Sequence, residues 1–148
     1  MEIIVPSVSH FNDCWQPFIK LFQLYWPNCP YKVSLITTDP RIGNSQGYDS
    51  RISFNKDNGW SANLDKSLDS WEEFVLLFQD DFFLSSKVDN SFVEEAYDVI
   101  KTFPKVNCVR LYPCPGADKH LFDKLGVIDE DAEYRVSCQV AIWKTDHL

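Results

Sequence analysis

The sequence lacks two features that would define its partners at once: a long apolar run and a cluster of basic residues. No segment reaches the length of a membrane span. The 14 basic residues stand against 22 acidic ones, which gives a formal net charge of −8. Nucleic acid and anionic membrane surfaces are therefore poor partners for the molecule as a whole. A phosphorylated ligand stays possible, since a bound cation can reverse the local sign of the charge.

Cysteine chemistry of the zinc or redox type is also missing. The five cysteines form no Cys-x-x-Cys pair and no cysteine–histidine spacing typical of zinc sites. We expect buried, reduced thiols at Cys14, Cys29, Cys108, Cys114 and Cys138. The opening MEIIVPSVSHF has an acidic second residue and only a short apolar run, unlike a secretory signal. The expected location is therefore the reducing cytoplasm.

Material for a packed core is abundant. Of the 148 residues, 45% are hydrophobic and 15% aromatic, which suits one folded domain spanning residues 1–148. Hydrophobic periodicity predicts strands alternating with helices. The expected strands cover 2–8, 32–39, 51–55, 74–79, 107–113 and 133–143, and the expected helices cover 12–26, 61–71 and 91–103. This alternation is typical of an α/β fold with an open, mostly parallel sheet and helices on both faces.

Local signals set the expected helix ends. Pro17 is tolerated only in a first turn, so the first helix should begin near it. Ser61 is placed to cap the second helix. Ser91 and Glu94 have the spacing of a capping box for the third, which Pro104 should close.

The segment LLFQDDFFL, residues 76–84, carries two adjacent carboxylates, Asp80 and Asp81, in an apolar setting. An unpaired carboxylate inside a sheet is costly. In an open α/β sheet the ligand lies beyond the carboxyl ends of the strands, so we expect both side chains to project into that crevice. Such a pair suits Mg²⁺ or Mn²⁺ together with substrate phosphates. The alternative is a helix cap or a solvated turn.

These residues lead to a resemblance. GWSANLDKSLDSWEEFVLLFQDDFFL, residues 59–84, resembles GT-A glycosyltransferases, in which a helix that contacts the nucleotide precedes a strand ending in a metal motif. IIVPSVSHF, SLITTD and VSCQVAIWK are similar to the first strand, the second strand and a stretch on the sugar side of the pocket. Gln79, Asp80 and Asp81 match the three places of the motif. Gln79 departs from it, because an acid is usual there, and this weakens the metal site or confines coordination to Asp81 and the diphosphate.

The resemblance implies sugar transfer from a nucleoside-diphosphate sugar, such as a UDP- or GDP-sugar, to a glycan or other hydroxyl acceptor in surface polysaccharide synthesis. It implies Mn²⁺ or Mg²⁺ on Asp81 and Asp80, and a catalytic base that is either a carboxylate in a missing part of the domain or Asp118. The implied nucleotide-sugar contacts are Ser7, Ser9, Asp39, Trp60, Asn63, Asp80 and Gln139. Each also has a structural alternative, such as a strand end, a turn or a helix start. His147 is either a late metal ligand or a surface residue.

The length of the chain, 148 residues, leads to alternative hypotheses about its function. A GT-A domain exceeds this length, so the resemblance implies a truncation after WKTDHL that removes the catalytic base. Exposed sheet surface would then favour homo-oligomers. A second hypothesis is a non-catalytic module that binds a nucleotide sugar or a partner chain. A third is metal-dependent phosphoryl chemistry, which would need an Asp-x-Asp nucleophile after the first strand, where VPSVS supplies none.

Overall fold

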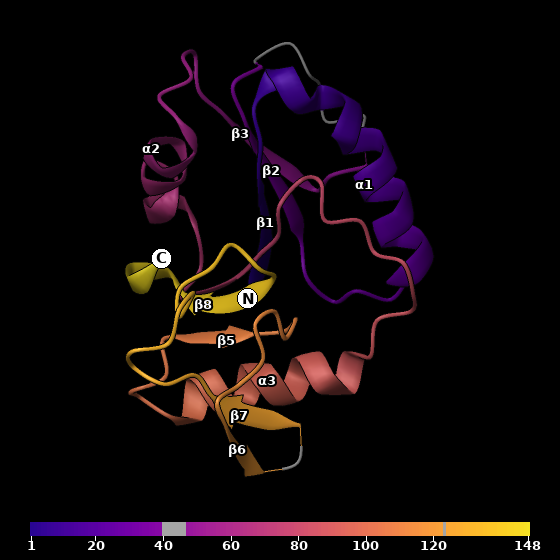
Figure 1. Ribbon diagram of the computed structural model, residues 1–148. Coiled ribbons are helices and arrows are strands. Elements are labelled where there is room, and N and C mark those ends of the chain that lie inside the picture. Colours follow the sequence, from indigo (N-terminus) through magenta and orange to yellow (C-terminus); the bar gives the residue numbers. More distant parts are fainter. Residues whose placement is uncertain (40–46, 123) are drawn as a thin grey trace.

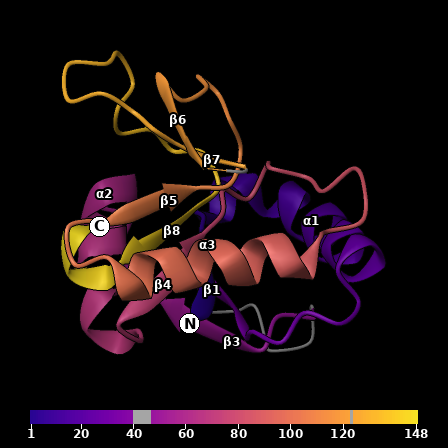
Figure 2. The same ribbon diagram turned by 90° about the horizontal axis from the view of Figure 1, so that it is seen from below.

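The computed structural model describes residues 1–39, 47–122 and 124–148. A six-stranded sheet lies between helices on its two faces, and a separate hairpin projects from it (Figures 1 and 2). The helices are α1 (Asn12–Tyr25), α2 (Trp60–Asp65) and α3 (Asn90–Thr102), with 3-10 turns at Ser9–Phe11, Leu68–Ser70 and Thr145–His147. The strands are β1 (Glu2–Pro6), β2 (Val33–Thr37), β3 (Ser50–Ser53), β4 (Phe74–Leu77), β5 (Cys108–Arg110), β6 (Lys119–Phe122), β7 (Leu125–Val127) and β8 (Ala141–Lys144).

The strand order confirms the predicted α/β fold class. The large sheet runs β3-β2-β1-β4-β8-β5, and β6 pairs with β7 in the hairpin. Strands β1 to β4 are mutually parallel, whereas β8 is antiparallel to both β4 and β5. The chain passes from β1 outward through β2 to β3 and then returns to the other side of β1 as β4. The strand order therefore reverses between β1 and β4, which is where open α/β sheets place their ligands.

Strand β1 is buried on both faces, as its uninterrupted apolar sequence predicts. Ile3 and Val5 belong to the core that α1 and α3 cover. Ile4 belongs to the opposite core, with Leu64 of α2. The alternation of strand side chains thus assigns every residue near the end of β1 to one helix layer or the other.

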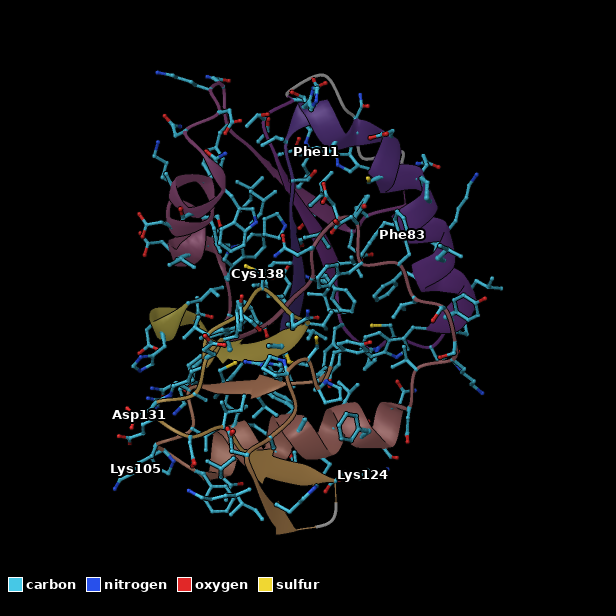
Figure 3. The ribbon with its side chains drawn as sticks, viewed as in Figure 1. Phe11, Phe83, Lys105, Lys124, Asp131 and Cys138 are labelled. Carbon is cyan, nitrogen blue, oxygen red and sulfur yellow. The ribbon has the colours of Figure 1, made fainter. Side chains whose placement is uncertain are left out.

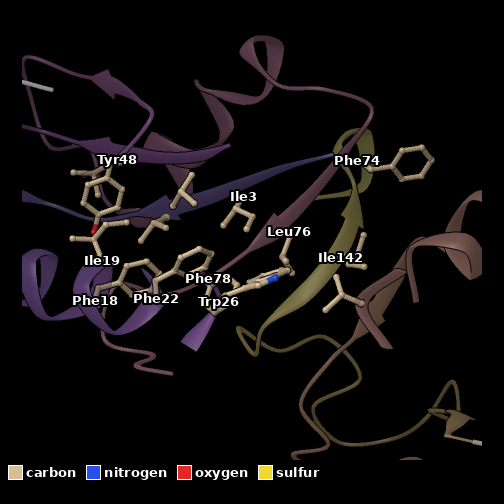
Figure 4. Packing of buried hydrophobic residues seen from close by; sticks show 14 of the residues in the cluster. Ile3, Phe18, Ile19, Phe22, Trp26, Tyr48, Phe74, Leu76, Phe78 and Ile142 are labelled. Carbon is tan, nitrogen blue, oxygen red and sulfur yellow. The ribbon is translucent and has the colours of Figure 1, made fainter. Parts of the chain in front are cut away.

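Helix α1 contributes an aromatic face to the first core (Figure 4). Phe18 and Phe22 each pack edge-on against Phe78, with ring centroids 5.8 and 6.0 Å apart. The helix begins at Asn12, as the predicted range 12–26 has it, so the expectation that Pro17 lies in the first turn is wrong. Pro17 is exposed within the helix, where it leaves the exposed Asp13 carbonyl without its helical partner. The buried aromatic face outweighs this local cost.

Two expected helix caps are also corrected. Helix α2 follows Gly59, whose φ of 92° suits glycine, and begins one residue before Ser61. It ends at Asp65, because a 3-10 turn takes over near residue 68. Helix α3 is capped by Asp89, whose carboxylate accepts hydrogen bonds from the backbone N–H groups of Ser91 and Phe92. Ser91 therefore lies inside the first turn and is not the cap.

The last part of the chain differs most from the sequence prediction. The strand expected over 133–143 is the shorter β8, and it runs antiparallel. Arg110 explains part of this change, because its guanidinium donates to the carbonyls of Tyr134 and Arg135 at 2.8 and 3.1 Å and so holds that segment as a loop. The hairpin of β6 and β7 was not predicted.

All five cysteines are free thiols, as predicted. Cys114 and Cys138 are exposed, however, so the expectation of burial is wrong for these two, and Cys14, Cys29 and Cys108 are only partly buried. None of the helices in the described part of the chain combines the length and hydropathy that a membrane crossing requires.

Candidate functional site

A cavity of about 230 Å³ opens where β1 and β4 end, at the reversal of strand order. Its polar lining consists of Ser7, Asn63, Gln79, Asp80 and Asp81. Its apolar lining consists of Pro6, Val8, Phe11, Ile36 and Trp60. The structure thus brings together the acid pair, the residues after the first strand and the start of α2, as the sequence analysis expected. The predicted crevice is present.

Asp80 is held in place from the side of α1. The Ser7 hydroxyl donates to Oδ2 of Asp80. Trp15 in turn donates its buried Nε1–H to Oγ of Ser7 at 2.7 Å. Ser7 is only 8% exposed, so this chain of bonds is shielded from competing water. The contacts fix one oxygen of the carboxylate at the cavity wall.

The surroundings of Asp80 favour its protonated form. Burial raises the pKa of the Asp80 carboxyl above its ordinary value of 3.8. The hydrogen bond from Ser7 lowers this pKa, and the negative charge of Asp81 raises it again. A cation bound beside the two carboxylates would offset both the cost of burying the charge of Asp80 and its repulsion by Asp81. The electrostatics of the site therefore suit a positive ligand.

Asp81 is the accessible member of the pair. It is exposed, lines the cavity and receives no hydrogen bond to its carboxylate from the described residues. Within the described ranges, no group of three or more histidine, cysteine or acidic side chains could hold a metal ion. A cation here would rest on Asp81 and Asp80 and take its other ligands from a substrate or water. That arrangement fits Mg²⁺, which commonly uses one or two carboxylates with phosphate oxygens.

Gln79 presents an unused donor. Its Nε2 is buried and has no hydrogen-bond partner in the described part of the protein.

Two exposed aromatic side chains also line the cavity: Trp60 is 39% exposed and Phe11 is 51% exposed. Sequence reasoning missed Phe11 as a site residue; its place in the segment between the first strand and the first helix of an α/β sheet was the available signal.

Asn63 lines the cavity, but its side-chain amide is already hydrogen-bonded within the protein. Its Nδ2 donates to Oδ1 of Asp57 at 3.0 Å, and its Oδ1 accepts the backbone N–H of Asn58 at 3.2 Å. The same Asp57 oxygen accepts the backbone N–H of Gly59. Asn63 therefore shapes the turn before α2 and thereby positions Trp60.

Three other predicted nucleotide-sugar contacts lie outside the lining. Ser9 bonds to Oγ1 of Thr38, linking the segment after β1 to the end of β2. Asp39 is buried beyond β2, and its backbone N–H donates to Oγ1 of Thr37. Gln139 precedes β8 by two residues, and its backbone N–H approaches Oγ of Ser137 at 3.5 Å. Their roles stay predictions.

Asp118 and His147 are separated from the cavity. Asp118 immediately precedes β6, where its carboxylate accepts the backbone N–H of Asp129 at 2.9 Å. Lys124, in the same hairpin, lies at the opposite end of Figure 3 from the cavity residue Phe11. His147 is on the terminal 3-10 turn, 3.9 Å from Asp146. The geometry brings neither side chain to the acid pair.

Comparison with known proteins supports the fold. The sequence matches no family model and no curated protein. Among solved structures, it is similar to the bifunctional IspDF from Campylobacter jejuni, with a TM-score of 0.53 and 16% identity over 99% of this chain. The chain spans 41% of the length of that protein. At this identity the likeness establishes the α/β fold.

The resemblance to GT-A glycosyltransferases is corrected by this finding, because the neighbour is a nucleotidyltransferase and no glycosyltransferase family matches. The assignment of sugar transfer, including the truncated form of such an enzyme, falls with it. The residues that suggested it remain at the site. A helix followed by an apolar strand that ends in acids is an arrangement that α/β nucleotide-binding folds share.

Proposed function

We propose that the cavity binds the phosphates of a nucleotide together with a divalent cation on Asp81 and Asp80. The chain would then be the nucleotide-binding domain of a transferase, with nucleotidyl transfer as the reaction class. One observation carries this proposal: two adjacent carboxylates, one fixed by Ser7, line a cavity at the point where strand order reverses. The likeness of the fold to IspDF supports the reaction class.

The charge of the site makes the cation necessary to the proposal. The described lining contains two acids and neither lysine nor arginine, in a chain of formal net charge −8. Phosphate oxygens would be repelled by such a wall. A divalent cation held by Asp81 and Asp80 would offset this repulsion and would neutralise charge that develops on a departing pyrophosphate. We therefore expect nucleotide binding only in the presence of the metal.

The protein supplies the remaining contacts. Ser7 orients Asp80, and Trp60 and Phe11 offer exposed ring faces on which a nucleobase can stack. In nucleotidyl transfer, an acceptor oxygen forms a bond to the α-phosphorus while the bond to pyrophosphate breaks. No described side chain other than Asp80 and Asp81 brings a carboxylate to this cavity.

Isothermal titration tests the proposal. Nucleoside triphosphates and diphosphates of cytosine, uracil, guanine and adenine are titrated into the protein with Mg²⁺, with Mn²⁺ and with a chelator. We expect binding of at least one nucleotide with the metal, its loss with the chelator, and a loss of about tenfold or more in Asp81→Asn. Asp131→Asn is the matched control, since Asp131 is exposed and lies outside the lining. Equal binding by both variants, or binding in the chelator, contradicts the proposal.

A further inference from the structure

Gln79 carries a hydrogen-bond donor that the protein does not use. Its Nε2 is buried without a partner among the described residues, and the side chain lines the cavity. A buried donor left unpaired lowers stability, because the hydrogen bonds it made to water in the unfolded chain are not replaced. An unused donor in the wall of a ligand cavity therefore points to a partner that arrives with the ligand.

Successive side chains along a strand point to opposite faces of the sheet, which places Gln79 and Asp80 on different sides of the cavity. Val75 and Leu77 pack into the core on the α2 side. By the same alternation Gln79, beyond the end of β4, falls on this side, and it lines the same cavity as Trp60. Asp80 points the other way and bonds to Ser7. The alternation thus separates the side chain of Gln79 from the bonds that hold Asp80, although both residues line the cavity.

We propose that Gln79 is a ligand-binding residue whose Nε2–H₂ group donates a hydrogen bond to an acceptor oxygen of the bound nucleotide. This inference rests on the proposed function and extends it. An ionised carboxylate at this position has no donor, so the amide has a role that an acid could not perform. Gln79 is then a specificity residue and is not a weakened acid of a metal motif.

Two substitutions separate these interpretations. Gln79→Met keeps the length of the side chain and removes the donor; we expect about tenfold weaker binding of the nucleotide with Mg²⁺. Gln79→Glu removes the donor and adds a third negative charge beside Asp80 and Asp81, so we expect a greater loss. If the residue were a weakened metal ligand, Gln79→Glu would instead bind more tightly.

The Tm of the variant distinguishes a ligand-binding role of Gln79 from a structural role, because loss of a structural residue would lower the Tm. Removing an unpaired buried donor should leave the Tm of Gln79→Met unchanged or higher, even as its affinity falls. Ser53→Ala is the matched control, because Ser53 Oγ is likewise buried without a partner in the described chain but lies outside the lining. This control should likewise have an unchanged or higher Tm, and it should keep the affinity of the wild type. A lower Tm for Gln79→Met would overturn the inference.

The source of the acceptor oxygen is resolved by titrating Mg²⁺–pyrophosphate and the free nucleoside as separate probes. A loss confined to the nucleoside and the nucleotide places the acceptor on the base or ribose; an equal loss with pyrophosphate places it on the phosphates. If the wild type and Gln79→Met bind the nucleotide with the same affinity, this inference is overturned and the proposed function is left intact. Failure of the wild type to bind any nucleotide overturns both.

Discussion

At the scale of one residue, the buried carboxylate of Asp80 lowers the stability of the folded protein when it is ionised. Its pKa is raised above 3.8 by burial, and the charge of Asp81 adds to this rise against the hydrogen bond from Ser7. The folded state then binds the proton more tightly than the unfolded chain does. Stability is therefore lost as pH rises from 3.8 through the raised pKa, and at neutral pH the ionised Asp80 is a cost.

Asp80→Asn should increase the free energy of unfolding at neutral pH, because the amide oxygen can still accept from Ser7 and no buried charge remains. The gain should shrink as pH falls and vanish below 3.8, where the wild-type group is protonated in both states. Urea unfolding at neutral pH and at about pH 3 measures this difference. A gain of the same size at both pH values would assign the effect to something other than ionisation.

The bond from Trp15 to Ser7 supports a second prediction at this scale. Ser7→Ala leaves the buried Nε1–H of Trp15 without its acceptor, and we expect a loss of about 1–3 kcal/mol in the free energy of unfolding. In a Trp15→Phe background the stranded donor is absent, so the same substitution should cost less. Chemical denaturation of the four proteins gives the coupling energy. Equal costs in both backgrounds would show that the two side chains are not coupled.

At the scale of elements, α1 presents a contrast between its two faces. Phe18 and Phe22 are buried, while Pro17 lies on the exposed face inside the helix. The aromatic contacts therefore stabilise a helix that its own proline weakens. The proline ring removes the backbone N–H that would otherwise bond to the carbonyl of Asp13.

Pro17→Ala restores that donor, and we expect it to increase the free energy of unfolding by about 1–3 kcal/mol, with the upper end set by the cost of an interior proline. Thermal unfolding followed by circular dichroism measures the change. Lys20→Ala, on the exposed part of the same helix, should stay within about 0.5 kcal/mol of the wild type. A destabilised Pro17→Ala would mean that the proline ring contributes more to the folded state than the restored hydrogen bond does.

The sequence predicted those elements whose pattern is strong and local. The apolar runs of β1, β2 and β4 and the aromatic period of α1 were sufficient to place the strands, the helix and the crevice at residue 80. The direction of β8 and the hairpin of β6 and β7 were beyond such reasoning, because they depend on distant contacts such as those of Arg110 with residues 134 and 135. The unpaired state of the buried Gln79 Nε2 likewise follows only from packing.

At the scale of the whole molecule, architecture and charge have to be considered together. The order of strands brings the ends of β1 and β4 to one place, and the acids found there were the same acids that suggested a glycosyltransferase. The fold alone does not choose a reaction, since α/β sheets of this kind host many. The negative charge of the chain adds the constraint that an anionic ligand needs a cation with it.

The most direct measurement is an anomalous-difference map from crystals of the protein grown with Mn²⁺ and the nucleotide that binds best in titration. We expect a manganese peak within about 2–2.5 Å of a carboxylate oxygen of Asp81, with nucleotide phosphates on the far side of the ion and the base toward Trp60. A nucleotide bound without manganese at this cavity, or bound elsewhere on the protein, would contradict the central claim.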